Sequence, residues 1–506
     1  MSLEIKINTL IHEVMTKLSL NKRDFIYYKN KVSYLCGLEP ADNNTTELSK
    51  SIPELLDDII NLLVAEQKIE DIFDFKEILS AQIMDTFIPV PSVIETQFYQ
   101  QYNRSPIAAT DYFFNLSTVS NYIQSERIKN NIHYKTPTAY GDLDITINLS
   151  KPEKDPEEIK KLKKLEAAQQ SKHYPKCMLC VENEGYAGRI NYPARSNHRI
   201  VELNLNQEPW YFQYSPYAYY NEHAIILNKE HSPMIINKNT FIRLIEFVEQ
   251  FPHYFIGSNA DLPIVGGSIL THDHYQGGRH VFPMEKAKIE KYYESDKFKN
   301  VEIGTVKWPM TVIRLKSEDK KALVDVAMEI FEAWKVYSDE ANDILAFTGE
   351  TPHNTVTPIA RRNNGAFELD IVLRNNRTSE EHPDGIFHPH KELHHIKKEN
   401  IGLIEVMGLA VLPGRLEKEL EKIAEIISGE VSYDREVALE DNDLNKHIDW
   451  IEEMLNKNSD MNLEDARNFV KEEVGIIFSK VLEDSGVFKR NKKGQAALEK
   501  FITSVI

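Results

Sequence analysis

The run Thr-His-Asp-His-Tyr-Gln-Gly-Gly at 271–278 constrains the local fold most, because it places two imidazoles and an amide at alternate positions directly after the apolar stretch 264–270. Successive side chains of a β-strand point to opposite faces, so a strand here would present His272, His274 and Gln276 on one face. Neutral imidazole is a good nucleophile toward phosphorus near pH 7, and an adjacent amide can donate hydrogen bonds to phosphoryl oxygens. The pattern therefore indicates phosphoryl or nucleotidyl transfer through a histidine; the alternative is a histidine-rich strand end that binds adventitious metal or nothing.

Length and charge exclude some classes of protein. A chain of 506 residues exceeds what one hydrophobic core usually organises, so two or more domains are expected. The formal net charge of −18 argues against a nucleic-acid-binding protein, since phosphate-backbone binders carry a basic patch. An anionic substrate would have to be received by local cations, and four arginines lie near the motifs: Arg189, Arg195, Arg199 and Arg279.

Cysteine usage and hydropathy indicate the compartment. Three cysteines in so long a chain cannot form a disulfide framework, and the first residues lack the apolar core of a signal peptide. The most apolar late stretch, 401–412, is too short to span a bilayer and carries Glu405. We therefore expect a cytoplasmic protein without a membrane segment.

Hydrophobic periodicity predicts the order of elements. Apolar residues recur at helical spacing in the N-terminal region (Ile7, Leu10, Ile11, Val14, then Leu55, Ile59, Leu62, Leu63) and at 416–427, where Gly429 is a candidate C-terminal cap. Further helices are predicted at 156–170, 240–250, 323–336 and from 444 onward, and strands at 142–148, 224–227, 306–315 and 366–373.

This order predicts an α+β fold in which two halves of similar arrangement lie between helical N-terminal and C-terminal extensions. We assign 1–135 to a helical N-terminal region, 136–300 to a catalytic half, 301–415 to a second half and 416–506 to a helical C-terminal region. The sequence similarity between the halves is too faint to establish a duplication.

Several ordered runs point to one family. They are Cys-Met-Leu-Cys-Val-Glu-Asn-Glu-Gly-Tyr at 177–186, Tyr-Ser-Pro-Tyr at 214–217, Asn-Glu-His at 221–223, Gly-Gly-Ser at 266–268 and the stretch 401–415. Together with His-x-His-x-Gln they resemble the galactose-1-phosphate uridylyltransferase family, in its bacterial class 2 branch, within the histidine-triad superfamily. The resemblance implies that the two halves are histidine-triad-like antiparallel sheets with helices.

Taken alone, the Cys-x-x-Cys spacing of Cys177 and Cys180 is compatible with a redox pair, half of a zinc site or two incidental thiols. A structural zinc site needs four ligands, and no second Cys-x-x-Cys supplies them. The resemblance implies one structural zinc per chain, bound by Cys177, Cys180, His231 and His272. The alternative is a metal-free, hydrogen-bonded arrangement of the same residues.

The resemblance also implies roles around the substrate. His274 would attack the α-phosphorus of a uridine diphosphate sugar, and Gln276 would hold phosphoryl oxygens. Asn259 and Ser268 match positions that contact the nucleotide phosphates, although each is also an ordinary turn residue. Arg189 and Arg195 are candidate phosphate contacts because they lie close to the motifs in the sequence, not because of the resemblance; the alternative is that each is an ordinary surface arginine.

Glu405 lies inside an apolar stretch, where a carboxylate is costly to bury without a partner. The resemblance implies that Glu405 accepts hydrogen bonds from sugar hydroxyls and that a lysine just before it contacts phosphate; Lys397 and Lys398 both fit, and we assign Lys398. The alternative is a strand with one solvated face. Class 1 members bind a second metal through histidines in the strand that corresponds to 367–372, which has none here, so we expect no second metal in this chain.

The implied activity is exchange of UMP between UDP-glucose and galactose 1-phosphate through a uridylyl-histidine, without magnesium or an organic cofactor, in a homodimer. The alternatives are another histidine-triad nucleotidyltransferase or hydrolase, and a zinc-stabilised nucleotide-binding protein.

Overall fold

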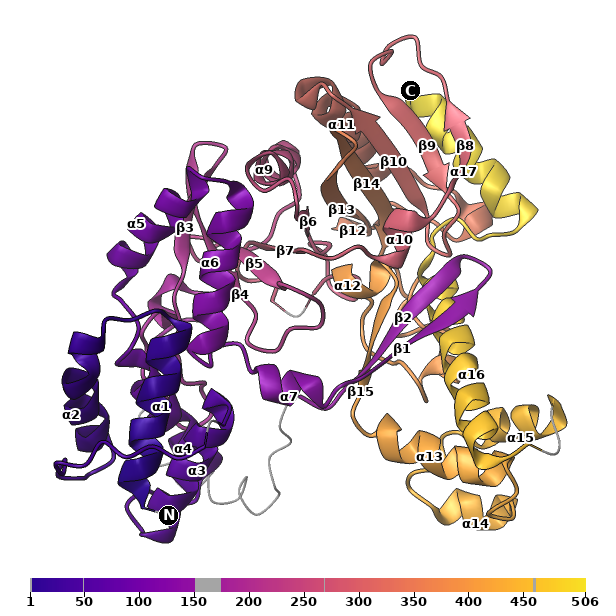
Figure 1. Ribbon diagram of the computed structural model, residues 1–506. Coiled ribbons are helices and arrows are strands. Elements are labelled where there is room, and N and C mark those ends of the chain that lie inside the picture. The colour runs from indigo at the N-terminus through magenta and orange to yellow at the C-terminus, as the bar shows by residue number, and fades with distance from the viewer. Residues whose placement is uncertain (1, 49, 151–173, 268, 458–460) are drawn as a thin grey trace. The chain divides into compact units, whose positions relative to one another are not determined.

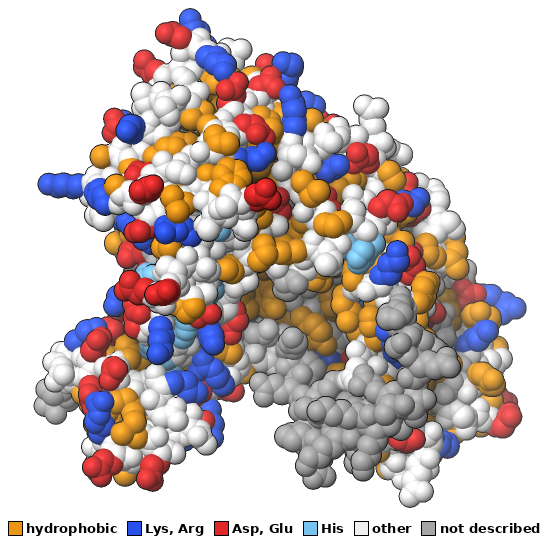
Figure 2. Space-filling model, turned by 180° about the vertical axis from the view of Figure 1, so that it is seen from behind, with side chains coloured by type: hydrophobic (Ala, Val, Ile, Leu, Met, Phe, Trp, Pro, Cys, Tyr) orange, Lys and Arg blue, Asp and Glu red, His pale blue; other side chains and the backbone are white. Residues whose placement is uncertain are grey.

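The computed structural model describes residues 2–48, 50–150, 174–267, 269–457 and 461–506 (Figure 1). The chain divides into two compact units: the first unit comprises Met1–Asn130 and Ser150–Ser232, and the second comprises Asn131–Leu149 and Pro233–Ile506. On the face shown in Figure 2, basic and acidic side chains are interspersed. Among the described residues, no helix is both long enough and apolar enough to cross a membrane.

The first unit begins with helices, as the periodicity predicts. Ile7, Leu10, Ile11 and Val14 are completely buried on α1 and face Leu55, Ile59 and Leu63 of α3 in a single hydrophobic core. Ser51 and Glu54 form a capping box that fixes the start of α3. The helices are α1 (Leu3–Lys17), α2 (Phe25–Leu35), α3 (Ile52–Ala65), α4 (Phe73–Asp85), α5 (Pro91–Tyr102), α6 (Pro106–Val119) and α7 (Ser125–Lys129).

The described residues of the first unit also form three antiparallel strands, β3 (Val201–Leu205), β4 (Glu208–Tyr214) and β5 (Ala224–Asn228). The strand expected at 224–227 is confirmed as β5. Alternate residues of β3 are buried because one face of these strands packs on aromatic side chains of α5 and α6, where Phe98 and Phe113 meet Phe212. The charged helix expected at 156–170 lies outside the described residues.

The second unit carries an antiparallel array of strands in the order β7-β6-β13-β14-β10-β9-β8. Helices α9 and α11 pack against each other and against this array. Asn237 and Thr240 form the capping box of α9, and Asp319 caps α11. The elements are α9 (Lys238–Gln250), β6 (Phe255–Gly257), β7 (His274–Gly278), α10 (Pro283–Lys286), β8 (Ile289–Tyr293), β9 (Glu302–Val306), β10 (Val312–Ser317), α11 (Lys320–Lys335), β11 (Phe347–Thr348), β12 (Thr351–Pro352), β13 (Asn354–Asn363) and β14 (Ala366–Asn375).

A smaller sheet pairs β1 (Ile132–Thr138) with β2 (Gly141–Asn148) and β2 with β15 (Leu409–Pro413). The strand expected at 142–148 is confirmed as β2. Beyond β15 the chain is helical, with α13 (Leu416–Ile427), α14 (Arg435–Glu440), α15 (Ile448–Lys457), α16 (Leu463–Ser485) and α17 (Lys492–Val505). Gly429 follows α13 at φ +78°, so it ends the helix in the left-handed conformation as expected.

The helices at 240–250 and 323–336 and the strand at 366–373 are confirmed as α9, α11 and β14. The single strand expected at 306–315 is wrong. Pro309 lacks a backbone N–H for a ladder, and Trp308 turns inward to donate its indole N–H to the Val406 carbonyl at 2.9 Å, so β9 ends at Val306 and β10 starts at Val312.

The α+β class is thus confirmed, with helices and antiparallel sheets in one chain. The four ranges 1–135, 136–300, 301–415 and 416–506 stay a prediction, because packing into compact units does not test where halves of an internal duplication would begin.

Candidate active site

His274 is the first residue of β7, and its side chain is buried. The Nδ1 nitrogen of His274 donates to the backbone carbonyl of His272 at 2.8 Å, since a carbonyl can only accept. A neutral ring held this way carries its lone pair on Nε2. Burial lowers the pKa of His274 to about 4, so the ring stays neutral near pH 7.

The expected strand alternation holds for His274 and Gln276, which both lie on β7, with Gln276 opposite Gly257 of β6. It does not extend to His272, which precedes the strand and is completely buried. His272 therefore orients the next histidine through its main chain rather than by sharing a strand face with it.

Asn259 lies close after β6 and connects it to α12 (Leu403–Val406). The Asn259 Oδ1 oxygen accepts a hydrogen bond from the Leu403 backbone N–H at 2.8 Å, which leaves the Nδ2 group as a donor. A Cβ atom at Gly267 would lie 2.4 Å from Asn259 Nδ2, so any other residue at this position would displace the Asn259 amide. Ser268, the other predicted phosphate contact, lies outside the described residues.

Glu405 lies in α12, not in a strand, so the alternative of a half-solvated strand is wrong. The Lys397 ammonium donates to Glu405 Oε1 at 2.6 Å, and the Gly402 N–H donates to Glu405 Oε2 at 2.9 Å. The expectation that this carboxylate is paired is therefore confirmed. Lys397 itself is buried, and the carboxylate raises its pKa against the opposing effect of burial.

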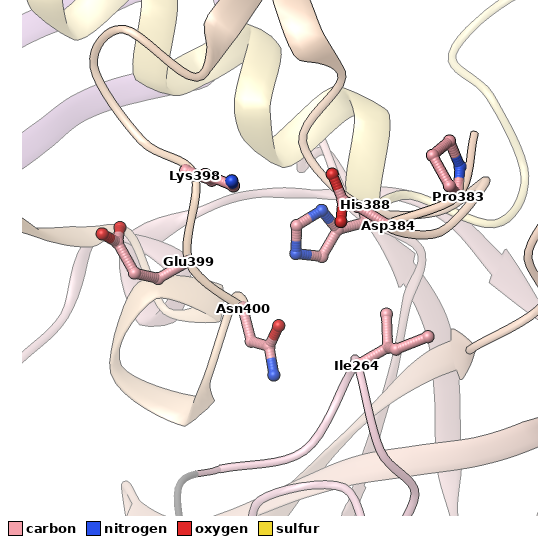
Figure 3. Close-up of a pocket in the computed structure, with 7 residues that line it drawn as sticks. All are labelled: Ile264, Pro383, Asp384, His388, Lys398, Glu399 and Asn400. Atoms are coloured by element: carbon pink, nitrogen blue, oxygen red, sulfur yellow. The ribbon is translucent and has the colours of Figure 1, made fainter. Parts of the chain in front are cut away.

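Lys398, the next residue, lines a pocket of about 360 Å³ (Figure 3). The pocket mixes cationic, acidic and amide groups, and the lysine is exposed and forms no ion pair with another described residue. Its lining residues are Ile264, Pro383, Asp384, His388, Lys398, Glu399 and Asn400. Sequence reasoning missed all of these except Lys398, although the five histidines between 382 and 395 were an available signal.

A candidate metal centre lies in the first unit. The Sγ atoms of Cys177 and Cys180 are 3.5 Å apart, and Cys180 Sγ is 3.2 Å from Nδ1 of His231. These three ligand atoms come from the segment before the short 3₁₀ turn Val181–Asn183 and from the loop after β5, 51 residues away. Two thiols and an imidazole at these separations suit a tetrahedral zinc ion. His272, the fourth predicted ligand, belongs to the second unit.

Arg189 and Arg195 also lie in the first unit. Arg189 donates from Nη1 to the Tyr174 carbonyl and the Tyr186 hydroxyl, both at 2.9 Å, and its guanidinium lies 4.3 Å from the centroid of the Tyr192 ring. Arg195 lies over the ring of Tyr122, 5.4 Å from its centroid. Both guanidinium groups are thus placed by aromatic neighbours.

The comparisons with known proteins cover almost the whole chain. The N-terminal domain of galactose-1-phosphate uridyl transferase matches residues 19–233, and the C-terminal domain matches residues 246–441. A galactose-1-phosphate uridylyltransferase of Caldanaerobacter subterraneus subsp. tengcongensis is 50% identical over 505 residues, covering 98% of this chain and 96% of the relative. A Fusobacterium nucleatum protein of the same name is also 50% identical, covering 99% and 98%. The galactose-1-phosphate uridylyltransferase 1 of Streptococcus pneumoniae serotype 4 is 48% identical over 99% of both chains.

Fold and site together define an α+β protein with a buried, neutral histidine at a strand end and a cysteine-histidine cluster of metal-ligand type. With the sequence matches, the chain belongs to the galactose-1-phosphate uridylyltransferase family.

Proposed function

We propose that this chain transfers UMP between UDP-glucose and galactose 1-phosphate through a uridylyl group carried on His274. The observation that carries the proposal is the hydrogen bond from His274 Nδ1 to the His272 carbonyl, which leaves Nε2 as the nucleophilic atom. The names of the relatives at about half identity over the full chain support the substrates.

Each half-reaction balances without an added acid or base. His274 Nε2 forms a bond to the α-phosphorus of UDP-glucose, the bond from that phosphorus to the bridging oxygen breaks, and glucose 1-phosphate leaves as an anion. A phosphate oxygen of galactose 1-phosphate then forms a bond to the same phosphorus, the N–P bond breaks, and His274 regains its lone pair. Because both the leaving group and the attacking group are phosphates, no hydroxyl has to be ionised.

Hydrogen-bond donors would stabilise the phosphoryl oxygens in both steps. We assign this role to the amides of Gln276 and Asn259 and to Ser268. Gly267 has no side chain, so its backbone would be able to come near the phosphates. Arg189 and Arg195 are proposed to balance the remaining phosphate charge.

On the sugar side we propose that Lys398 receives the phosphate of the hexose 1-phosphate from the pocket of Figure 3, because its ammonium is exposed and is not neutralised by an ion pair with another described residue. Glu405 would accept hydrogen bonds from sugar hydroxyls. Its two oxygens already accept from Lys397 and Gly402, so its remaining lone pairs point in fixed directions.

We propose one structural zinc per chain, held by Cys177, Cys180 and His231 with His272 as the fourth ligand. A zinc ion bound this way would fix the backbone of His272 and so the carbonyl that orients His274. We further propose a cytoplasmic location, in keeping with three cysteines that form no disulfide with one another in the structure. We also propose a homodimer, which light scattering on the purified protein tests.

The deciding experiment incubates the protein with UDP-glucose labelled in the α-phosphate and measures intact mass. The expected result is a mass increase of one uridylyl group that disappears when galactose 1-phosphate is added. Label that never becomes covalent would contradict the mechanism, and covalent label that only water removes would indicate a hydrolase.

A further inference from the structure

His390, Glu392 and Asp484 bring three potential metal ligands together in the second unit, far along the chain from the cysteine cluster. One ligand atom from each lies within 4.8 Å of the others. His390 and Glu392 lie at the start of the 3₁₀ turn Lys391–Leu393, and Asp484 lies in the last turn of α16. Asp484 lies beyond residue 441, where the match to the family's C-terminal domain ends.

The imidazole of His390 is held in one orientation. Its Nε2 donates to the Ile386 carbonyl at 3.1 Å, and the ring of His382 stacks on it with centroids 4.1 Å apart. Because Nε2 carries the proton in this arrangement, a neutral ring presents a bare lone pair at Nδ1. Metal-bound histidines usually donate the N–H of their other ring nitrogen to a group such as a backbone carbonyl, as His390 does here.

The Nδ1 atom of His390 faces a carboxylate oxygen. Asp484 Oδ2 accepts the His390 backbone N–H at 3.1 Å, and Asp484 Oδ1 lies 3.6 Å from Nδ1. That separation is longer than a charged N–H···O hydrogen bond, which measures about 2.7–2.9 Å. It matches two ligands of one tetrahedral zinc, which lie about 3.4 Å apart when each bond is about 2.1 Å.

The ammonium group of Lys489 does not occupy the space between these ligand atoms. Lys489 Nζ donates to the backbone carbonyls of Glu483 at 3.2 Å and Asp484 at 2.8 Å, so its hydrogen bonds go to the end of α16. Glu392 is exposed, and its carboxylate can close on an ion without disturbing the core.

We propose that His390, Glu392 and Asp484 form a second divalent-metal site that binds zinc. Zinc at this site joins the segment that precedes α12 to the end of α16, and water fills the open coordination position. This proposal departs from the expectation of no second metal, which rested only on the absence of histidines from the 367–372 strand; the ligands proposed here lie outside that strand. Its ligands are one nitrogen and two carboxylates, so it binds zinc less tightly than a site containing two thiolates.

The test uses the full-length protein. Zinc retained after gel filtration is counted by mass spectrometry, and the protein is then titrated with ZnCl₂ by calorimetry. We expect the titration to show one zinc site, and this site should still be present in Cys180→Ser. Glu392→Ala and His390→Ala should each lower the zinc affinity of this site at least tenfold. Asp484→Asn should lower it as much, although its amide oxygen can still accept the hydrogen bond from the His390 backbone N–H.

His394→Gln is the matched control. This histidine lies four residues from His390 and bonds the Pro389 carbonyl, but it is not one of the three ligands. The control should bind zinc like the wild type, and ZnCl₂ should raise its Tm but not that of Glu392→Ala. Zinc isotherms of Glu392→Ala and His390→Ala that superimpose on the wild type would overturn the proposal and leave His390 and Asp484 as an ordinary ion pair.

Discussion

At the scale of single residues, the His274 side chain carries most of the proposed chemistry. Replacing it with alanine removes the nucleophile, so His274→Ala should form no covalent uridylyl adduct while keeping its fold. Intact mass after incubation with labelled UDP-glucose gives the readout, and circular dichroism checks the fold. A folded variant that still accumulates label would show that another group is the nucleophile.

Gln276 allows a second prediction, because histidine-triad hydrolases commonly have a third histidine at this position. A glutamine can donate a hydrogen bond to a phosphoryl oxygen but cannot give up a proton, which suits leaving groups that depart as anions. Gln276→Ala should slow both half-reactions by about 10²-fold, since one oxyanion donor is often worth that much. Single-turnover kinetics with UDP-glucose, followed by a chase with galactose 1-phosphate, measure both steps. Unchanged rates would mean that the amide only packs.

Gln276→His is the complementary variant. Imidazole fills a similar space but can give a proton to a departing oxygen, so this variant should transfer slowly and hydrolyse more of the uridylyl-enzyme in buffer alone. Hydrolysis no faster than in the wild type would remove the explanation for glutamine at this position.

At the scale of elements, β13, β14 and β10 share a buried group of four charges. Asp370, which is completely buried, accepts from Arg314 at 2.7 and 2.9 Å and from Arg361 at 2.8 Å, and Glu368 pairs with Arg361. The two arginines lower the pKa of Asp370 against the opposing effect of its burial. These acids occupy the 367–372 strand, so its polar residues are used in a structural ion-pair network.

Asp370→Asn leaves two buried guanidinium groups short of negative charge, and it should lower the free energy of unfolding by about 3–5 kcal/mol. Urea unfolding followed by circular dichroism measures the change. The matched control is Asp325→Asn, which removes a carboxylate paired with Lys238 and Lys321 at the surface and should cost about 1 kcal/mol or less. Equal losses in the two variants would show that burial does not set the importance of Asp370.

The cysteine cluster belongs to the same scale, because it joins the segment at 177–180 to the loop after β5. If zinc holds them together, Cys180→Ser should lower both the zinc content, by about one ion per chain, and the Tm. Elemental analysis and thermal unfolding test this. Wild-type zinc content and Tm in the variant would remove Cys180 from the ligand set.

The elements also show what sequence reasoning can reach. Helices α1, α9, α11 and α13 were predictable because a buried apolar face repeats every 3.6 residues. The break at Trp308 and Pro309 was not, since the indole N–H finds its acceptor at Val406, 98 residues away. The metal-ligand types and the histidine of β7 could be read from short motifs. The choice between Lys397 and Lys398 could not, because it depends on which side chain meets Glu405 in space.

At the scale of the whole molecule, the C-terminal helices contact the segment that precedes α12 through two histidines, His395, which is partly buried, and His447, which is buried. His395 Nδ1 lies 2.8 Å from His447 Nδ1, and His447 Nε2 donates to Glu419 Oε2 at 3.0 Å. His447 thus accepts at Nδ1, and a neutral His395 donates to it. Arg415, Lys446 and Trp450 surround the pair, and burial lowers the pKa of His395 to about 3.

This arrangement predicts how stability depends on pH. Below about pH 6.5 the unfolded chain protonates His395, whereas the folded chain stays neutral there until about pH 3, so the unfolded state binds more protons and stability falls as the pH is lowered. This residue should lower the free energy of unfolding by about 2 kcal/mol at pH 5 relative to pH 7.5.

The variant His395→Gln tests this prediction. Its amide N–H can still bond His447 Nδ1, but the glutamine does not titrate. Between pH 7.5 and pH 5 the free energy of unfolding of the variant should therefore fall by about 2 kcal/mol less than that of the wild type. Urea unfolding at both pH values, followed by the fluorescence of the tryptophans that include Trp450, gives the comparison, with His12→Gln at an exposed position as the control. The same pH dependence in wild type and His395→Gln would show that the histidine pair does not make the C-terminal helices sensitive to acid.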